Sequence, residues 1–125
     1  MSSWQRLVDR AKTTLEEARL LLEAGHPVGA ADRSYYAMFY AASALLAAEG
    51  IDVASHRALL AAFGKDMVKT GRVDAQYHRM LLDAFDLRQT ADYDVQADVD
   101  LATAREAFCA ARDFIGMAEA ILKKD

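Results

Sequence analysis

The segment "LRQTADYD" at positions 87–94 holds side chains whose types and spacing could do chemistry. Arg88 falls on the apolar side of a predicted helix, and Asp92 follows four residues later, where one helical turn brings a carboxylate to a guanidinium. One interpretation is a structural salt bridge that closes the helix. The other is an anion-binding or acid–base cluster that also uses Tyr93 and Asp94. The residues alone leave both interpretations open.

Two histidines and one Glu-x-x-His pair could also carry chemistry. His56 opens a predicted helix, where free backbone amides and the helix dipole could hold an anion, and a half-exposed imidazole without a ligand is the alternative. His78 is expected on a solvated helix face. Glu23 and His26 have the spacing of a di-iron bundle site, but the second such pair that this site needs is missing. We therefore predict neither a metal site nor a cofactor.

The elements that must position these side chains are helices. Apolar residues recur at helical spacing along the whole chain and predict five helices that end at glycine or polar breaks. The expected ranges are 3–24, 28–49, 55–69, 74–91 and 99–123. Ser2 and Gln5 resemble a capping box at the start of the first. We predict an all-α fold, an up-and-down helical bundle of four long helices plus a shorter fifth, in a single domain over 1–125.

The second predicted helix is apolar almost all the way round. Its sequence "DRSYYAMFYAASALLAAEG" places four aromatic residues within six positions and has almost no charge after Arg33. A helix of an isolated four-helix bundle normally keeps a polar face towards water. Either this helix is the central one of the bundle, or its outer face packs on a second copy of the protein.

The composition excludes several classes of protein. A net charge of −4 and a pI near 5.3 argue against a broad basic surface that binds nucleic acid. Cys109 is the only cysteine, so an internal disulfide is excluded and a reducing cytoplasm is the simplest location. The N-terminal stretch mixes charges with apolar residues, unlike a secretory or transit signal. No stretch approaches the ~20 uncharged apolar residues that span a bilayer, so we expect no membrane insertion.

Three runs of sequence, taken together, resemble a known family. "DRSYYAMFYAASALLAAEG", "SHRALLAAFGKDMVKTG" and "LRQTADYD" occur in the order typical of the HEPN family, in particular of its small stand-alone prokaryotic branch with R-x-Y-Y-A-x-F and R-x-x-x-D-Y motifs. The resemblance covers about 15–122. It implies an all-helical bundle that commonly forms a homodimer. Many members are RNases, often toxins encoded beside a small nucleotidyltransferase antitoxin, so the implied partners are that antitoxin and RNA or a nucleotide.

The resemblance also implies roles for individual residues. In the RNase members, an R-x(4-6)-H motif supplies an arginine that contacts phosphate and a histidine that assists attack by the ribose 2′-hydroxyl. Arg88 matches the arginine, but no histidine follows it at the required spacing. Asp94 stands at one of those positions, and Asp92 and His56 are the other candidates for proton transfer. Arg72 and His78 fit the spacing by letter count but fall at the start of a helix, and we treat that match as coincidence.

The remaining motif residues are implied to bind or to be modified. Arg33, Tyr36 and Phe39 match R-x-Y-Y-A-x-F and imply packing, with Arg33 reaching Asp92 or a ligand. Tyr93 is, by analogy, a candidate acceptor for modification by a nucleotidyltransferase. We predict a protein of a toxin–antitoxin-like system that binds a nucleotide or a nucleotidyltransferase partner. The alternative is a metal-independent RNase toxin that cuts single-stranded RNA at a dimeric site.

Overall fold

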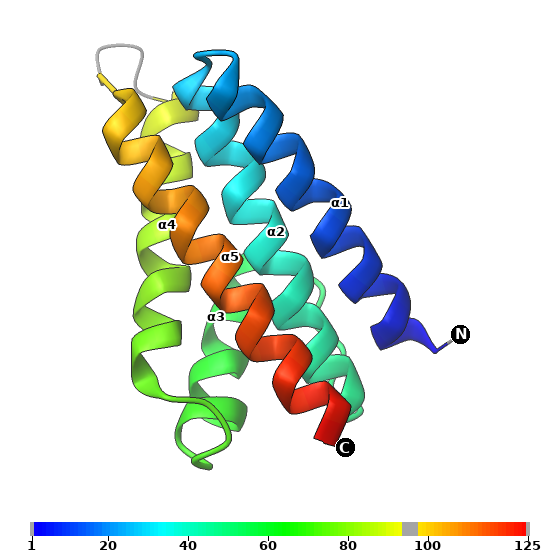
Figure 1. Cartoon of the computed structure of the whole chain (residues 1–125). Coiled ribbons are helices and arrows are strands. Elements are labelled where there is room, and N and C mark those ends of the chain that lie inside the picture. Colours follow the sequence, from blue (N-terminus) through cyan, green and yellow to red (C-terminus); the bar gives the residue numbers. More distant parts are fainter. Residues whose placement is uncertain (1, 94–97, 125) are drawn as a thin grey trace.

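The computed structural model describes residues 2–93 and 98–124 (Figure 1). Across these residues the chain is helical and contains no strand, which confirms the predicted all-α class. The elements are the α-helices α1 (Ser3–Glu23), α2 (Pro27–Ala48), α3 (His56–Ala62), α4 (Ala75–Tyr93) and α5 (Leu101–Lys124), and the π-helix η1 (Phe63–Val68) that continues α3.

The four long helices run alternately up and down, as predicted. In Figure 1, α1 and α4 rise while α2 and α5 descend, and α3 with η1 lies at the lower end. α2 packs against α1, α4 and α5, and it also contacts α3 and η1. Within the described residues α1 and α4 do not pack against each other. One strip of α2 is therefore left uncovered between them.

Local signals define the helix ends at three places, and the first is the predicted capping box. The Ser2 hydroxyl accepts a hydrogen bond from the backbone amide of Gln5, whose side chain accepts one from the Ser2 amide at 2.8 Å. The Ser55 hydroxyl accepts a hydrogen bond from the Ala58 amide at 3.0 Å and caps α3. Gly25, with φ of 82°, ends α1 in the left-handed conformation that favours glycine.

Two predicted helix boundaries move by two residues, and one predicted helix changes its geometry. α4 runs to Tyr93, two residues beyond the predicted end, so Asp92 is helical. α5 begins at Leu101 rather than at Val99, because the Asp100 carboxylate accepts a hydrogen bond from the Thr103 amide at 2.8 Å and caps the helix. The helix predicted from Ser55 to Lys69 changes from α to π geometry at η1.

The apolar character of α2 follows from its central position. Eleven of its residues are buried, including Tyr35 and Met38, which have no exposed surface. Its remaining edge is only half-buried and carries Arg33, Tyr36 and Tyr40. Helices of the same chain cover most of α2, which confirms the central-helix interpretation for its buried side. The homodimer stays a prediction.

The prediction that His78 lies on a solvated face was wrong. Its imidazole is half-buried and its Nε2 lies 3.0 Å from the carbonyl oxygen of Leu60. The ring also lies against Gly64 in η1 and is tilted on Phe63 at 6.0 Å between ring centroids. The sequence pattern could not show this, because the contact depends on α4 folding back onto the end of α3.

Gly64 leaves room for this imidazole, and we expect Gly64→Ala to lower the free energy of unfolding by about 1–3 kcal/mol. A Cβ at position 64 would stand 2.8 Å from His78 Cε1, so the ring must shift and weaken its contact with Leu60. Urea unfolding measures the effect. Gly116→Ala in α5 is the matched control, since a Cβ there meets nothing within 4 Å. An equal loss for Gly64→Ala in a His78→Ala background would contradict this explanation.

Candidate functional site

Three helices bring charged side chains around the ring of Tyr36. The guanidinium carbon of Arg33 lies 5.0 Å, and that of Arg88 5.2 Å, from the Tyr36 ring centroid. The His56 ring, from the start of α3, meets Tyr36 edge-on at 5.6 Å. Asp32 and Asp92 join this group through ion pairs. We call Asp32, Arg33, Tyr36, His56, Arg88 and Asp92 the Tyr36 cluster.

Arg88 is held by carboxylates from two helices. Its Nε lies 3.1 Å from Asp92 Oδ2, one turn along α4, and 3.3 Å from Asp32 Oδ1 on α2. The predicted Arg88–Asp92 pair is therefore present. The Arg88 side chain is only 18% exposed. Both of these contacts are made at Nε, and the two terminal nitrogens of a guanidinium can bind a phosphate.

The charge of Arg88 is maintained despite its burial. Burial alone would lower the pKa of Arg88, but Tyr36 and the carboxylates of Asp32 and Asp92 outweigh it, so the net shift of that pKa is upward. Arg88 is thus a cation at neutral pH. The cluster can offer a fixed positive charge beside an aromatic face.

Arg33 has different partners from those expected. Its guanidinium lies 3.1 Å from Asp32 Oδ2 and 3.6 Å from Glu17 Oε1 on α1. Among the described residues, no ion pair joins it to Asp92. Asp32 instead stands between the two arginines, with one oxygen towards each. Sequence reasoning missed Asp32, because its role requires α2 and α4 to be side by side.

His56 is held by a residue that sequence reasoning also missed. Its Nδ1 lies 2.7 Å from the hydroxyl of the buried Tyr35, and the two rings stack at 5.6 Å. Burial lowers the pKa of His56, and the positive charge of Arg88 lowers it further. Burial also raises the pKa of Tyr35, so that its hydroxyl keeps its proton. His56 is therefore a neutral imidazole at neutral pH, the form that can accept a proton.

This shift predicts how stability depends on pH. The folded protein binds a proton at His56 less readily than the unfolded chain, whose histidine has the ordinary pKa of 6.5. The stabilisation is complete above that pH and decreases as the pH falls through the lower pKa of the folded state. We expect His56→Gln to reduce the loss of unfolding free energy between pH 7.5 and pH 5.5, as measured by urea unfolding. Equal losses in both proteins would contradict the expectation.

The other predicted site residues lie apart from the Tyr36 cluster or outside the described residues. Tyr93 is the last residue of α4 and is 76% exposed. Asp94 lies outside the described residues. Arg72 forms an ion pair with Glu49, whereas His78 contacts the Leu60 carbonyl, so the two do not form a joint R-x(5)-H site. Within the described residues no group of His, Cys, Asp and Glu is arranged to hold a metal ion.

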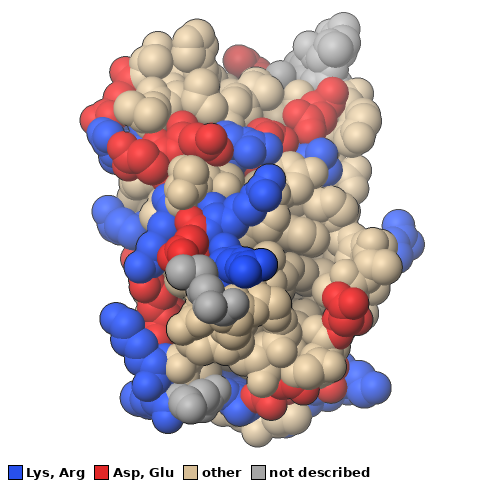
Figure 2. Space-filling view, turned by 90° about the vertical axis from the view of Figure 1, so that its right-hand side faces the viewer, with Lys and Arg blue, Asp and Glu red and all other residues tan. Residues whose placement is uncertain are grey.

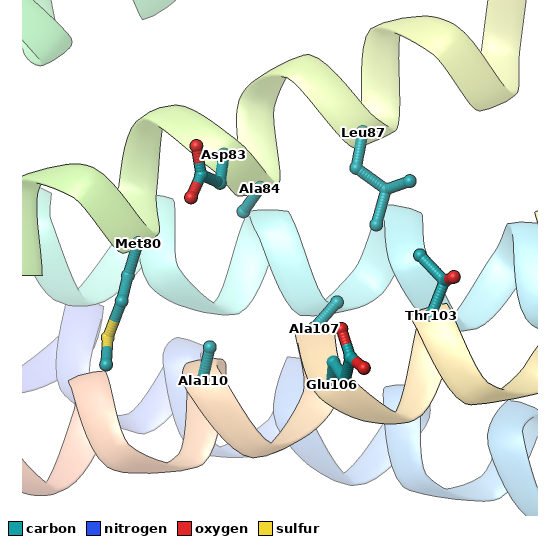
Figure 3. Close-up of a pocket in the computed structure, with 8 residues that line it drawn as sticks. All are labelled: Met80, Asp83, Ala84, Leu87, Thr103, Glu106, Ala107 and Ala110. Atoms are coloured by element: carbon teal, nitrogen blue, oxygen red, sulfur yellow. The ribbon is translucent and has the colours of Figure 1, made fainter.

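A second feature is a cavity of about 300 Å³ that lies between α4 and α5 (Figure 3). Its floor is mostly apolar, and the carboxylates of Asp83 and Glu106 are its only charged groups. The other lining residues are Met80, Ala84, Leu87, Thr103, Ala107 and Ala110. It contains no member of the Tyr36 cluster, and its acidic groups do not suit an anion.

On the side of α1, the surface has no large patch that is only positively or only negatively charged. Figure 2 shows Lys and Arg atoms interspersed with Asp and Glu atoms in a band, beside an area with few charged atoms. This pattern agrees with the net charge and makes broad electrostatic binding of nucleic acid a poor explanation for this face. None of the helices, over the residues searched, has the length and hydropathy of a membrane span.

Comparison with known proteins supplies a family and several relatives. A family model described as HEPN domain matches residues 4–121. A UPF0332 protein of Thermotoga maritima is 33% identical over 96% of this chain and 89% of its own length. A UPF0332 protein of Gloeobacter violaceus is 40% identical over 71% of each chain. A protein of Methanocaldococcus jannaschii named "putative toxin" is 33% identical over 76% of this chain and 65% of its own.

Proposed function

Because this chain belongs to the HEPN family, we propose that it is a toxin-like protein whose Tyr36 cluster binds a nucleotide. The names of two relatives as toxins support the first part of the proposal. The observation that carries the second part is the position of Arg88, a charged guanidinium held over the face of Tyr36 by carboxylate contacts at its Nε. A phosphate binds the guanidinium, while a base stacks on the aromatic edge of α2.

A nucleotidyltransferase partner fits the same surface. In this proposal the partner carries a nucleotide and brings it to the end of α4, where Tyr93 lies. The Tyr93 hydroxyl is the proposed acceptor, since its side chain is 76% exposed and follows Asp92 directly. Like other toxin–antitoxin pairs, the two proteins would then control each other through contact or through modification.

The RNase alternative is supported by the neutral His56 beside Arg88. In this proposal Arg88 binds the scissile phosphate, and Nε2 of His56 accepts the proton of the ribose 2′-hydroxyl in the tautomer whose Nδ1–H donates to the Tyr35 oxygen. The 2′-oxygen bonds to phosphorus, and the 5′-oxygen leaves and takes a proton from water. His56 then replaces the histidine that is missing after Arg88, from another helix. The homodimer implied by the family would place two such clusters together.

One experiment distinguishes the two proposals. Purified protein is titrated with AMP by calorimetry and, in parallel, incubated in chelator with a labelled single-stranded RNA. Saturable AMP binding without RNA cutting supports the binding function. Cutting that persists in chelator supports the RNase. If the folded protein neither binds AMP nor cuts RNA, and retains no nucleotidyltransferase when the two are mixed, the Tyr36 cluster is not a nucleotide site. Light scattering on the same sample measures whether it is a homodimer.

A further inference from the structure

A polar cleft of about 400 Å³ lies between α1 and α2, next to the Tyr36 cluster, with which it shares Arg33. α1 contributes Asp9, Arg10, Thr13, Thr14 and Glu17 to its walls, and α2 contributes Arg33 and Tyr40. No motif of the sequence analysis pointed to the α1 residues. The cleft is a different kind of space from the α4–α5 cavity, because it combines both signs of charge, a hydroxyl and an aromatic ring.

The aromatic ring in the wall of the cleft, Tyr40, is covered on one face by the Arg10 guanidinium. The guanidinium carbon of Arg10 lies 5.2 Å from the centroid of the Tyr40 ring. A phenol ring under a guanidinium is the type of surface on which nucleic-acid bases stack, because both groups present a flat, polarisable face. Tyr40 is only half-buried, so its ring is accessible from the cleft.

The cleft continues into the Tyr36 cluster through two contacts. The rings of Tyr36 and Tyr40 are 6.2 Å apart, one turn along α2. Arg33 lines the cleft and also lies over Tyr36. Arg88 and Arg33 both lie over Tyr36, and Arg10 lies over Tyr40. A ligand whose phosphate is bound by Arg88 can therefore extend past Arg33 into the cleft.

The charges of the cleft indicate which part of a nucleotide it suits. Asp9 and Glu17 balance Arg10 and Arg33, so the cleft has no excess positive charge for a polyphosphate. Carboxylates accept hydrogen bonds from hydroxyl and amino groups, which a ribose and a base supply. The Thr13 hydroxyl both donates and accepts. A neutral nucleoside with several donors matches this set of groups better than a second phosphate does.

We infer that the α1–α2 cleft is a nucleoside subsite, in which a base stacks against the Arg10–Tyr40 pair and ribose or base donors bind Glu17 and Asp9. This inference rests on the proposed nucleotide site at Arg88, to which Arg33 connects it. The nucleoside belongs either to a free nucleotide or to a residue of a single-stranded RNA. In the second case the strand crosses α2, with one phosphate at Arg88 and the neighbouring base in the cleft.

The test measures binding of two probes, AMP and the RNA trinucleotide ApApA, by calorimetry on the full chain. Tyr40→Leu removes the stacking ring and keeps apolar volume, and we expect it to weaken binding about 10-fold, the effect of losing one base–aromatic stack. Arg10→Gln should weaken binding in the same direction and does not endanger folding, because Arg10 is exposed. Arg6→Gln is the matched control on the same helix, where Arg6 does not line the cleft.

The outcomes separate this inference from the proposed function. Binding that is lost with Arg88→Ala but changes less than about twofold with both Tyr40→Leu and Arg10→Gln would overturn the subsite and leave the Arg88 site standing. Binding that depends on Tyr40 but not on Arg88 would support the cleft and overturn the Arg88 site. If Tyr40→Leu weakens the binding of ApApA alone, the nucleoside belongs to an RNA strand. If it weakens the binding of AMP as well, the nucleoside belongs to a free nucleotide. No binding of either probe to the folded wild-type protein would overturn the subsite.

Discussion

Replacing Arg88 by alanine is expected to weaken AMP binding by about 10- to 100-fold, the effect of losing hydrogen bonds to a charged group. The loss of the guanidinium is only one of two reasons for the weaker binding. Asp92, which lies 3.1 Å from Arg88 Nε, would lose this cation, and Asp32 would keep only its pair with Arg33. The excess of carboxylate charge repels a phosphate, so the site attracts its ligand less. If the protein is an RNase, cutting should disappear in the same variant.

Two companion variants show whether the loss belongs to this site. Arg88→Lys keeps the charge but lacks the planar fork that can bind a phosphate with two nitrogens, so we expect an intermediate affinity. Arg79→Ala removes an exposed arginine of the same helix that pairs with Asp83, and binding should be unchanged. Circular dichroism checks that each variant is folded. Wild-type affinity in a folded Arg88→Ala protein would rule out the proposed role of Arg88.

The helical bundle was predictable because the sequence signals that specify its helices act between residues close together in the chain. Helical spacing of apolar residues, the Ser2–Gln5 capping box and the glycine after α1 each act within a few residues along the chain. The Arg88–Asp92 pair was predictable for the same reason, since the two residues are one helical turn apart. The apolar surface of α2 also indicated a helix with neighbours on several sides. What remained open was whether those neighbours come from the same chain.

The composition of the site was only partly predictable, because its decisive contacts join distant segments. Asp32 pairs with Arg88 across 56 positions, and His56 meets the hydroxyl of Tyr35 across 21. No periodicity within one helix encodes such pairs. Resemblance to a family indicated Arg33, Tyr36, His56, Arg88 and Asp92, but not Asp32 and Tyr35, which contact Arg88 and His56. The contact of His78 with η1 was unpredictable for the same reason, since it depends on how α4 packs against η1.

Tyr35→Ala is expected to have the largest effect on stability, a loss of about 3–5 kcal/mol in the free energy of unfolding. Tyr35 has no exposed surface, and its ring contacts the rings of Tyr36, Phe39, His56 and Phe85 at centroid distances between 5.3 and 6.1 Å. Its removal leaves a cavity at the point where α2, α3 and α4 meet. Urea unfolding measures the loss. A loss below about 1 kcal/mol would mean that these rings do not hold the three helices together.

Tyr35→Phe separates the packing of this ring from its hydrogen bond. The ring stays, and only the hydroxyl that lies 2.7 Å from His56 Nδ1 is removed, so we expect a loss of about 0.5–1.5 kcal/mol. Phosphate binding at Arg88 should survive this change, because Tyr35 contacts neither carboxylate of that site. If His56 accepts a proton from RNA, its orientation matters, and cutting should fall in Tyr35→Phe while AMP binding stays near that of the wild type. A variant that cuts RNA normally would show that His56 does not depend on Tyr35 for its position.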